Sequence, residues 1–201
     1  MGSRSGIAIG LAVAIAAGIG AGAALWLHDE PLALDAGTVL PEPHPVSAFE
    51  LVDHEGRAFD RHALAGRWSL VFAGFTHCPD ICPLTLATMG ELGTRLGAAS
   101  PRLVFVSVDP ERDTPARIAA YLRHFGPDLV GATGSHAAIG SFTRDLGLAQ
   151  VKVPGVGDDY TVDHSAALVL LDSQVRVAGY FPPPHDVDRL AADLAALGSG
   201  G

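Results

Sequence analysis

Apolar and polar positions follow two alternating periods along residues 46–197, and their order predicts a folded α/β domain. Continuous apolar runs at residues 69–75, 102–108 and 166–171 are typical of buried strands. Between and after these runs the apolar positions take a helical period, as in Leu86, Met89, Leu92 and Leu96, then Ile118, Tyr121, Leu122 and Phe125, and finally Val187, Leu190, Ala191, Leu194 and Leu197. Strands that alternate with helices indicate a mixed sheet flanked by helices on both faces.

Turn and capping residues fix several boundaries of these elements. Residues 48–60 alternate around a turn at Gly56 and predict an entry hairpin, and residues 166–181 flank a turn at 172–174 and predict a second hairpin. Thr114 followed by Pro115 predicts the start of a helix, and Ser135 predicts the start of another. A short strand is expected at residues 129–132. This order of elements is the one that a thioredoxin-like fold would give.

The N-terminal segment is apolar enough to act as a membrane anchor. Residues 6–27 carry no charge, and as a helix they would be roughly 33 Å long, which is enough to cross a bilayer. Arg4 precedes the run and Asp29 and Glu30 follow it, which favours a cytoplasmic N-terminus and an extracytoplasmic domain. A cleaved signal peptide is the alternative, since residues 21–23 (Ala-Gly-Ala) offer a cleavage site.

Composition and charge indicate how the chain is divided into segments and which class of partner is not expected. The pattern predicts an anchor at residues 1–28, a tether rich in proline and acidic residues at 29–45, and one folded domain at 46–201. The net charge is -9 and the positive charges are scattered, so a nucleic-acid partner is not expected.

Both cysteines of the chain lie in the segment CPDICP at residues 78–83, between a predicted strand and a predicted helix. Pro83 lacks an N–H, so it must lie in the first turn of that helix, which indicates Asp80 as the N-cap. Cys82 then lies in the first turn and Cys78 in the loop before it. The positive end of the helix is expected to favour thiolate, the form that binds metals and attacks disulfides. A structural disulfide between the two is the plainer alternative.

Three segments of the domain resemble the signature stretches of the Sco/SenC family. They are FTHCPDICP at 75–83, SVDPERDTP at 107–115 and DYTVDHS at 159–165, in the family's order. The resemblance implies a thioredoxin-like fold with an inserted hairpin, copper as the bound metal, and Cys78, Cys82 and His164 as its ligands. It also implies a role in assembling the dinuclear copper centre of cytochrome c oxidase. The loop at residues 153–159 looks shorter than in some members, which bears on partner preference.

The chemistry of these three residues agrees with that implication. Two thiolates and an imidazole suit Cu(I), and Cu(II) also accepts them, whereas zinc would want a fourth ligand. The plainer alternative for His164 is a surface or core histidine, since the chain has nine. Other polar residues near these segments are expected to have other roles. His77 is an alternate ligand at most, and Asp163 is either a partner of the imidazole or a solvated carboxylate. Asp109, Glu111 and Asp113 form an acidic loop that caps a helix or docks a partner.

Three functions compete at this point. The first is a copper metallochaperone, not an enzyme, that would deliver copper to the copper-accepting subunit of cytochrome c oxidase. Its other partners would be the membrane and a thiol reductant or another copper chaperone. The second is an extracytoplasmic thiol–disulfide oxidoreductase that uses Cys78 and Cys82 as its redox pair and would reduce the cysteines of the oxidase subunit. The third is a copper or redox sensor. His164 favours the first, because a dithiol reductase does not require it. The expected location is the periplasmic side of the membrane.

Overall fold

The computed structural model describes residues 34–155 and 159–198. The expected anchor at residues 6–27 lies outside them. Within the part described, no helix is both long and apolar enough to span a membrane.

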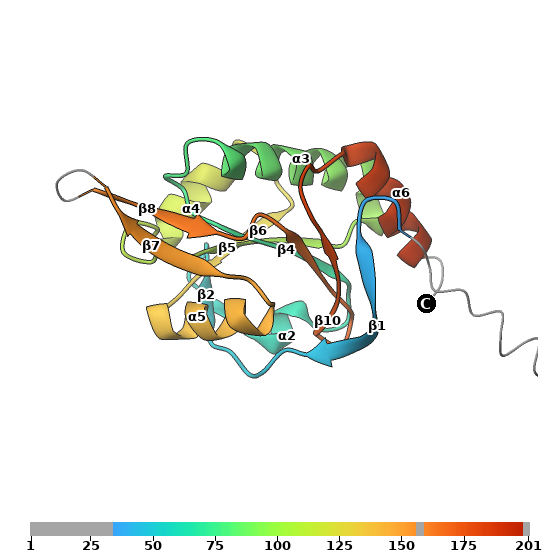
Figure 1. Cartoon of the computed structure of the whole chain (residues 1–201), viewed down its shortest axis with the longest axis horizontal. Helices are drawn as coiled ribbons and strands as arrows, with labels where there is room; N and C mark the ends of the chain where they lie inside the picture. Colours follow the sequence, from blue (N-terminus) through green and yellow to red (C-terminus); the bar gives the residue numbers. More distant parts are fainter. Residues whose placement is uncertain (1–33, 156–158, 199–201) are drawn as a thin grey trace, which may run out of the picture. The chain divides into compact units, whose positions relative to one another are not determined.

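A mixed sheet of eight strands forms the centre of the domain, in the order β1-β10-β9-β4-β5-β6-β2-β3 (Figure 1). The strands are β1 (Thr38–Pro45), β2 (Leu51–Asp53), β3 (Ala58–Phe59), β4 (Ser69–Gly74), β5 (Arg102–Ser107), β6 (Leu129–Thr133), β9 (Leu168–Leu171) and β10 (Arg176–Phe181). β4, β5 and β6 are parallel, and the other pairs are antiparallel. Every residue of β4 and β9 is buried, because helices cover both faces of the sheet.

The helices form two layers around this sheet. α3 (Ile81–Leu96), α4 (Pro115–Leu122) and α6 (Val187–Gly198) lie on one side, and α2 (Arg61–Leu64) and α5 (His136–Asp145) lie on the other (Figure 1). Thr114 and Ser135 cap α4 and α5 by accepting hydrogen bonds from Arg117 N and Ala138 N, as predicted. The predicted α/β order is confirmed.

Two hairpin turns are closed by buried aspartates in the same way. Asp53 accepts hydrogen bonds from the backbone N–H groups of Glu55 and Arg57 and from Arg57 Nε, and these bonds close the β2–β3 turn. Asp172 accepts the equivalent bonds from Gln174 and Arg176 at the β9–β10 turn. Leu171 pairs with Ser69 at the start of β4, so the Asp172 turn lies at the opposite end of the sheet from the cysteine loop.

The predicted tether is too long. Residues 38–45 form β1, which pairs with β10 at the edge of the sheet, and the folded unit begins at Leu34. The prolines made this segment look unlike a strand, because proline has no N–H to donate to a neighbouring strand. An edge strand tolerates proline at positions where no N–H is needed. The register shift between Val39 and His44 accommodates Pro41 and Pro43.

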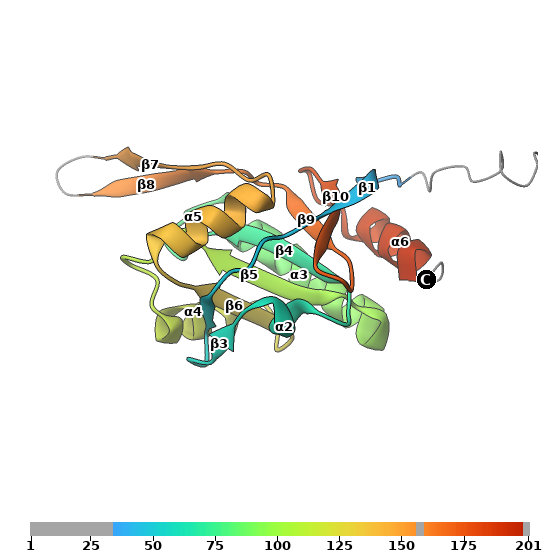
Figure 2. The same ribbon diagram turned by 90° about the horizontal axis from the view of Figure 1, so that it is seen from below.

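A separate hairpin extends beyond the main sheet (Figure 2). Its strands, β7 (Gln150–Pro154) and β8 (Tyr160–His164), are antiparallel and form a two-stranded sheet of their own. The resemblance implied an inserted hairpin without giving its position, and this hairpin ends at His164, the last residue of β8.

Candidate metal centre

The cysteine loop joins the end of β4 to the start of α3. The first three helical positions are Ile81, Cys82 and Pro83, so the missing N–H of Pro83 falls in the first turn, as predicted. Asp80 occupies the N-cap position, but its side chain makes no capping hydrogen bond, which corrects the expected role. The Cys82 N–H instead donates to Cys78 Sγ at 3.4 Å, so a thiol takes the place of the capping oxygen.

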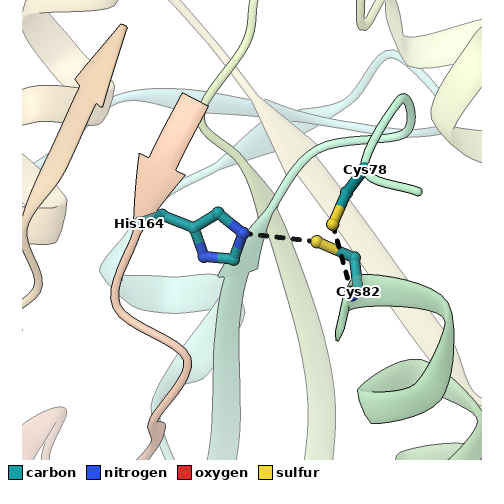
Figure 3. Close-up of side chains that lie close together, drawn as sticks. All are labelled: Cys78, Cys82 and His164. Carbon is teal, nitrogen blue, oxygen red and sulfur yellow. Dashed lines mark hydrogen bonds between the residues drawn. The ribbon is translucent and has the colours of Figure 1, made fainter. Parts of the chain in front are cut away.

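His164 meets the cysteines from a distant part of the chain (Figure 3). Its Nε2 lies 3.3 Å from Cys82 Sγ, and its Nδ1 lies 3.1 Å from the carbonyl oxygen of Ser165. Because a carbonyl only accepts, the neutral ring carries its proton on Nδ1 and presents the Nε2 lone pair to the sulfur. Ser165 therefore orients the imidazole, and the exposed Asp163 does not. The ligand atoms of Cys78, Cys82 and His164 all lie within 4.8 Å of one another.

Aromatic rings form the inner wall of this centre. Phe72 and Phe75 contact the imidazole edge to face, with ring centroids at 5.9 and 5.8 Å. Cys82 is fully buried, whereas Cys78 is half-buried in the loop. The buried sulfur of Cys82 therefore contacts the imidazole directly, and the more accessible sulfur of Cys78 lies beside them, within 4.8 Å.

Burial governs the protonation of the Cys82 thiol and the His164 imidazole. It raises the pKa of the Cys82 thiol far above the ordinary value, and the neighbouring Cys78 thiol raises it further. The expectation that the helix end would favour thiolate is therefore wrong for the metal-free Cys82, because desolvation outweighs the helix end. Burial also lowers the pKa of His164, while the Ser165 carbonyl and Asp163 oppose that shift. A metal bound here must displace the Cys82 proton, whereas the imidazole is already neutral.

A second group of ligating atoms lies beside the first. His77, Asp109 and Asp113 also come within 4.8 Å of one another, but protein donors already occupy them. Asp113 is fully buried and accepts from Thr76 N at 2.8 Å, Thr76 Oγ at 2.5 Å and Ser107 Oγ at 2.6 Å. His77 Nε2 lies 2.8 Å from Arg117 Nη2, so its ring is engaged with α4.

Asp109 anchors the β7–β8 hairpin to the loop after β5. Its carboxylate accepts from Tyr160 Oη at 2.6 Å and from Arg112 Nε at 2.5 Å. The Arg112 guanidinium stacks on the Tyr160 ring, 3.7 Å from its centroid, and the Lys152 ammonium lies 3.8 Å from the same centroid. Lys152 also donates to the exposed Glu111 at 2.7 Å. Tyr160 holds the strand that carries His164, and this role could not be predicted from the sequence, although the residue lies in the third signature stretch.

Comparison with known proteins agrees with this geometry. The SCO1/SenC family model matches residues 39–199. A Stutzerimonas stutzeri protein whose name proposes copper binding is 35% identical over 174 residues, which cover 84% of this chain and 85% of that protein. The copper-bound structure of Bradyrhizobium japonicum ScoI is similar, with 38% identity, a TM-score of 0.70 and coverage of 76% of this chain and 98% of that one.

A third similar structure is that of BsSco, which is described as having a disulfide switch and as a member of the Sco family of cytochrome c oxidase assembly proteins. The identity is 25% and the TM-score 0.65, with 82% of this chain and 99% of that chain covered. The likeness to these structures confirms the mixed α/β, thioredoxin-like fold. With its three signature stretches joined at one centre and the family model matched over nearly the whole described region, this chain belongs to the SCO1/SenC family.

Proposed function

We propose that this chain is a copper metallochaperone that holds copper through Cys78, Cys82 and His164 and delivers it for assembly of the dinuclear copper centre of cytochrome c oxidase. The observation that carries the proposal is the meeting of two free thiols and one correctly oriented imidazole within 4.8 Å. Two sulfurs and one nitrogen form a soft donor set with low coordination number, which suits Cu(I) and is also accepted by Cu(II).

The structure of the centre suits a transferable ion. Cys82 and His164 are held on packed elements, with His164 against Phe72, whereas Cys78 is half-buried in a loop. An incoming ligand from a partner can therefore reach the metal at Cys78 while the inner pair still holds it. The copper-bound relative and the oxidase-assembly description of BsSco support both the cargo and the client.

A thiol–disulfide oxidoreductase is the second candidate, and the unequal exposure of the two sulfurs favours it. An accessible Cys78 could attack a partner's disulfide, and the buried Cys82 could then resolve the mixed disulfide. In this reaction two thiols are oxidised to one disulfide while the partner's disulfide is reduced to two thiols. His164 has no necessary part in that exchange, so it separates the two candidates.

The proposed location is the extracytoplasmic side of the membrane, with residues 6–27 as the anchor. Its support is the length of the uncharged run and the charges that flank it. Protease added to spheroplasts should remove the domain and leave a small membrane fragment. Full protection of the domain would contradict this topology, and a soluble mature protein would indicate cleavage.

Complementation of a deletion strain tests the function. A strain without this protein should lose cytochrome c oxidase activity at low copper and regain part of it when copper is raised, because excess metal can substitute for a carrier. His164→Ala should fail to restore the oxidase although both thiols remain. If His164→Ala restores activity as fully as the native chain does, the oxidoreductase is the better account.

A further inference from the structure

We propose that Asp113 is a positioning residue of the copper centre, which holds the loop of Cys78 in the geometry that binds the metal; this inference rests on the proposed function. Asp113 belongs to the loop between β5 and α4 and lies far in sequence from the cysteines. Its hydrogen bonds reach none of the three ligands directly, and the ones that reach the cysteine loop are those to Thr76.

The three ligands differ in what fixes them. Cys82 is packed in the first turn of α3 with no exposed surface, and His164 is held by the Ser165 carbonyl and two phenylalanine rings. Cys78 is held less firmly, because it lies in the short segment between Gly74, the last residue of β4, and Ile81, the first of α3, is only partly packed against the core, and its sulfur accepts one weak bond from the Cys82 N–H. Its own N–H donates to Phe75 O at 3.3 Å. The position of Cys78 therefore depends on what holds this segment.

Asp113 is the main side-chain anchor of that segment. Both Thr76 donors, the backbone N–H and the hydroxyl, point to its two carboxylate oxygens, and Thr76 is two residues from Cys78. Arg117 Nε donates to Thr76 Oγ at 3.1 Å, and His77 Nδ1 lies 3.3 Å from the same oxygen. The carboxylate itself is fully buried and is fixed from β5 by Ser107 Oγ. The loop is therefore tied to the neighbouring strand and helix through one side chain.

A buried carboxylate with this many donors strongly favours a single loop conformation, since each unmade bond would leave a buried polar group unsatisfied. Without it, the segment around Cys78 would have to be ordered by the metal itself. The ordering of one backbone residue costs roughly a factor of ten in an equilibrium constant. Loss of Asp113 should therefore appear as weaker copper binding, and not only as a less stable fold.

The test compares two buried aspartates at opposite ends of the sheet. The full-length chain, reduced and kept in mild detergent, is titrated with Cu(I) against a chromophoric chelator, and its urea midpoint is measured in parallel. Asp113→Ala should weaken Cu(I) binding by about tenfold or more, since at least one loop residue is released. Asp172→Ala, which opens the distant β9–β10 turn, should lower the urea midpoint but leave the Cu(I) affinity within about twofold, as expected for independent sites.

Variants of the same hydrogen-bond network sharpen the result. Thr76→Val removes the hydroxyl that binds Asp113 and should weaken Cu(I) binding more than Ser107→Ala does, because Ser107→Ala removes one bond to the same carboxylate and leaves both bonds to the loop in place. Asp113→Asn retains one acceptor oxygen and should recover part of the affinity, which keeps the test available if Asp113→Ala fails to fold. The effects of Thr76→Val and Asp113→Asn should be less than additive in the double variant.

The outcomes separate the two proposals. A native chain that binds no copper would overturn the proposed function and this inference together. A native chain that binds copper, with Asp113→Asn and Thr76→Val both within about twofold of it, would overturn the inference alone. Equal losses of affinity in Ser107→Ala and Thr76→Val would also overturn it, because the effect would then be a general one on stability.

Discussion

The two groups of ligating side chains beside the cysteine loop differ in whether their lone pairs are free. In the group of Cys78, Cys82 and His164, the contacts of the ligand atoms are weak: Cys82 Sγ lies 3.3 Å from His164 Nε2, and Cys78 Sγ accepts from the backbone N–H of Cys82 at 3.4 Å. In the group of His77, Asp109 and Asp113, strong donors from five other residues occupy the atoms: Thr76, Ser107, Arg112, Arg117 and Tyr160. Closeness of ligating atoms alone does not make a metal centre. The first group is therefore the one proposed as the metal centre, whereas the hydrogen bonds of the second connect the loops around it.

The largest effect is expected from the cysteines. Cys78→Ser or Cys82→Ser should abolish tight Cu(I) binding by the reduced chain, because a hydroxyl is a poor ligand for a soft ion. Copper retained per chain after dialysis, measured by atomic absorption, gives the result directly. Asp109→Asn should keep one copper per chain, and loss of copper in this variant would contradict the division between the two groups.

The two histidines that flank the cysteines provide a matched pair for the next effect. Loss of a residue that only hydrogen-bonds to a metal ligand weakens metal binding by roughly 10–100-fold. His164→Ala removes a ligand itself, so it should weaken Cu(I) binding by at least that much. His77→Ala should leave the affinity unchanged, because its Nε2 faces Arg117. Competition against a chromophoric chelator measures both variants. A larger loss in His77→Ala than in His164→Ala would reverse the assignment of the two groups.

β4 passes close to the sulfur of Cys82, so a larger side chain on this strand should disturb the group of Cys78, Cys82 and His164 and not the group of His77, Asp109 and Asp113. A Cβ at Gly74 would lie 2.9 Å from Cys82 Sγ and 3.0 Å from a ring carbon of Phe72. Gly74→Ala should therefore lower the free energy of unfolding by about 1–3 kcal/mol and weaken Cu(I) binding as Cys82 shifts.

Gly140→Ala is the control for this variant. Gly140 lies within α5, and a Cβ there would have its nearest neighbour, Gln150 Nε2, at an ordinary 3.9 Å. This substitution should raise the free energy of unfolding by up to about 1 kcal/mol, through helix propensity, and leave copper binding alone. Urea unfolding of both variants measures the difference. A Gly74→Ala chain as stable as the native one would show that the strand and Cys82 are less closely packed than described.

Tyrosine titration should give the smallest effect, and it tests the second group. Burial raises the pKa of Tyr160, and its hydrogen bond to Asp109 raises it further; burial also raises the pKa of Tyr121 and Tyr180. In the unfolded chain a tyrosine has a pKa near 10. Because the pKa is higher in the folded chain, the folded state is stabilised below about pH 10, and this stabilisation is lost as the pH rises through the pKa of the folded chain. At pH 10–11 the native chain should show less tyrosinate absorbance than the urea-unfolded chain. Equal absorbance would contradict the Asp109–Tyr160 contact.

Local signals allowed much of the fold to be predicted from the sequence. Pro83 restricts the start of α3, Thr114 and Ser135 cap the helices that follow them, and the apolar run of β4 is buried at all six positions. The hairpin of β7 and β8 could not be found from its pattern, because only Val162 among its residues is fully buried. The edge strand β1 was missed for a related reason, since most of its residues are exposed and its prolines resemble a tether.

The candidate site was predictable in its members but not in its electrostatics. The three ligand candidates came from the paired cysteines and the family resemblance, and the structure brings them together. The raised pKa of Cys82 depends on burial by residues remote in sequence, which helix position alone cannot reveal. The contact between Thr76 and Asp113 spans 37 positions and has no local signature, so Asp113 was assigned to helix capping. What it holds is the cysteine loop.

X-ray absorption at the copper edge tests the central claim most directly. The reduced full-length chain loaded with one equivalent of Cu(I) should show two sulfur neighbours and one imidazole nitrogen, because Cys78, Cys82 and His164 are the group whose lone pairs are free. His77→Ala should give the same spectrum, and His164→Ala should lose the nitrogen and keep both sulfurs. A native spectrum with a single sulfur and two or more nitrogen or oxygen neighbours would contradict the account, because it would place the second group on the metal.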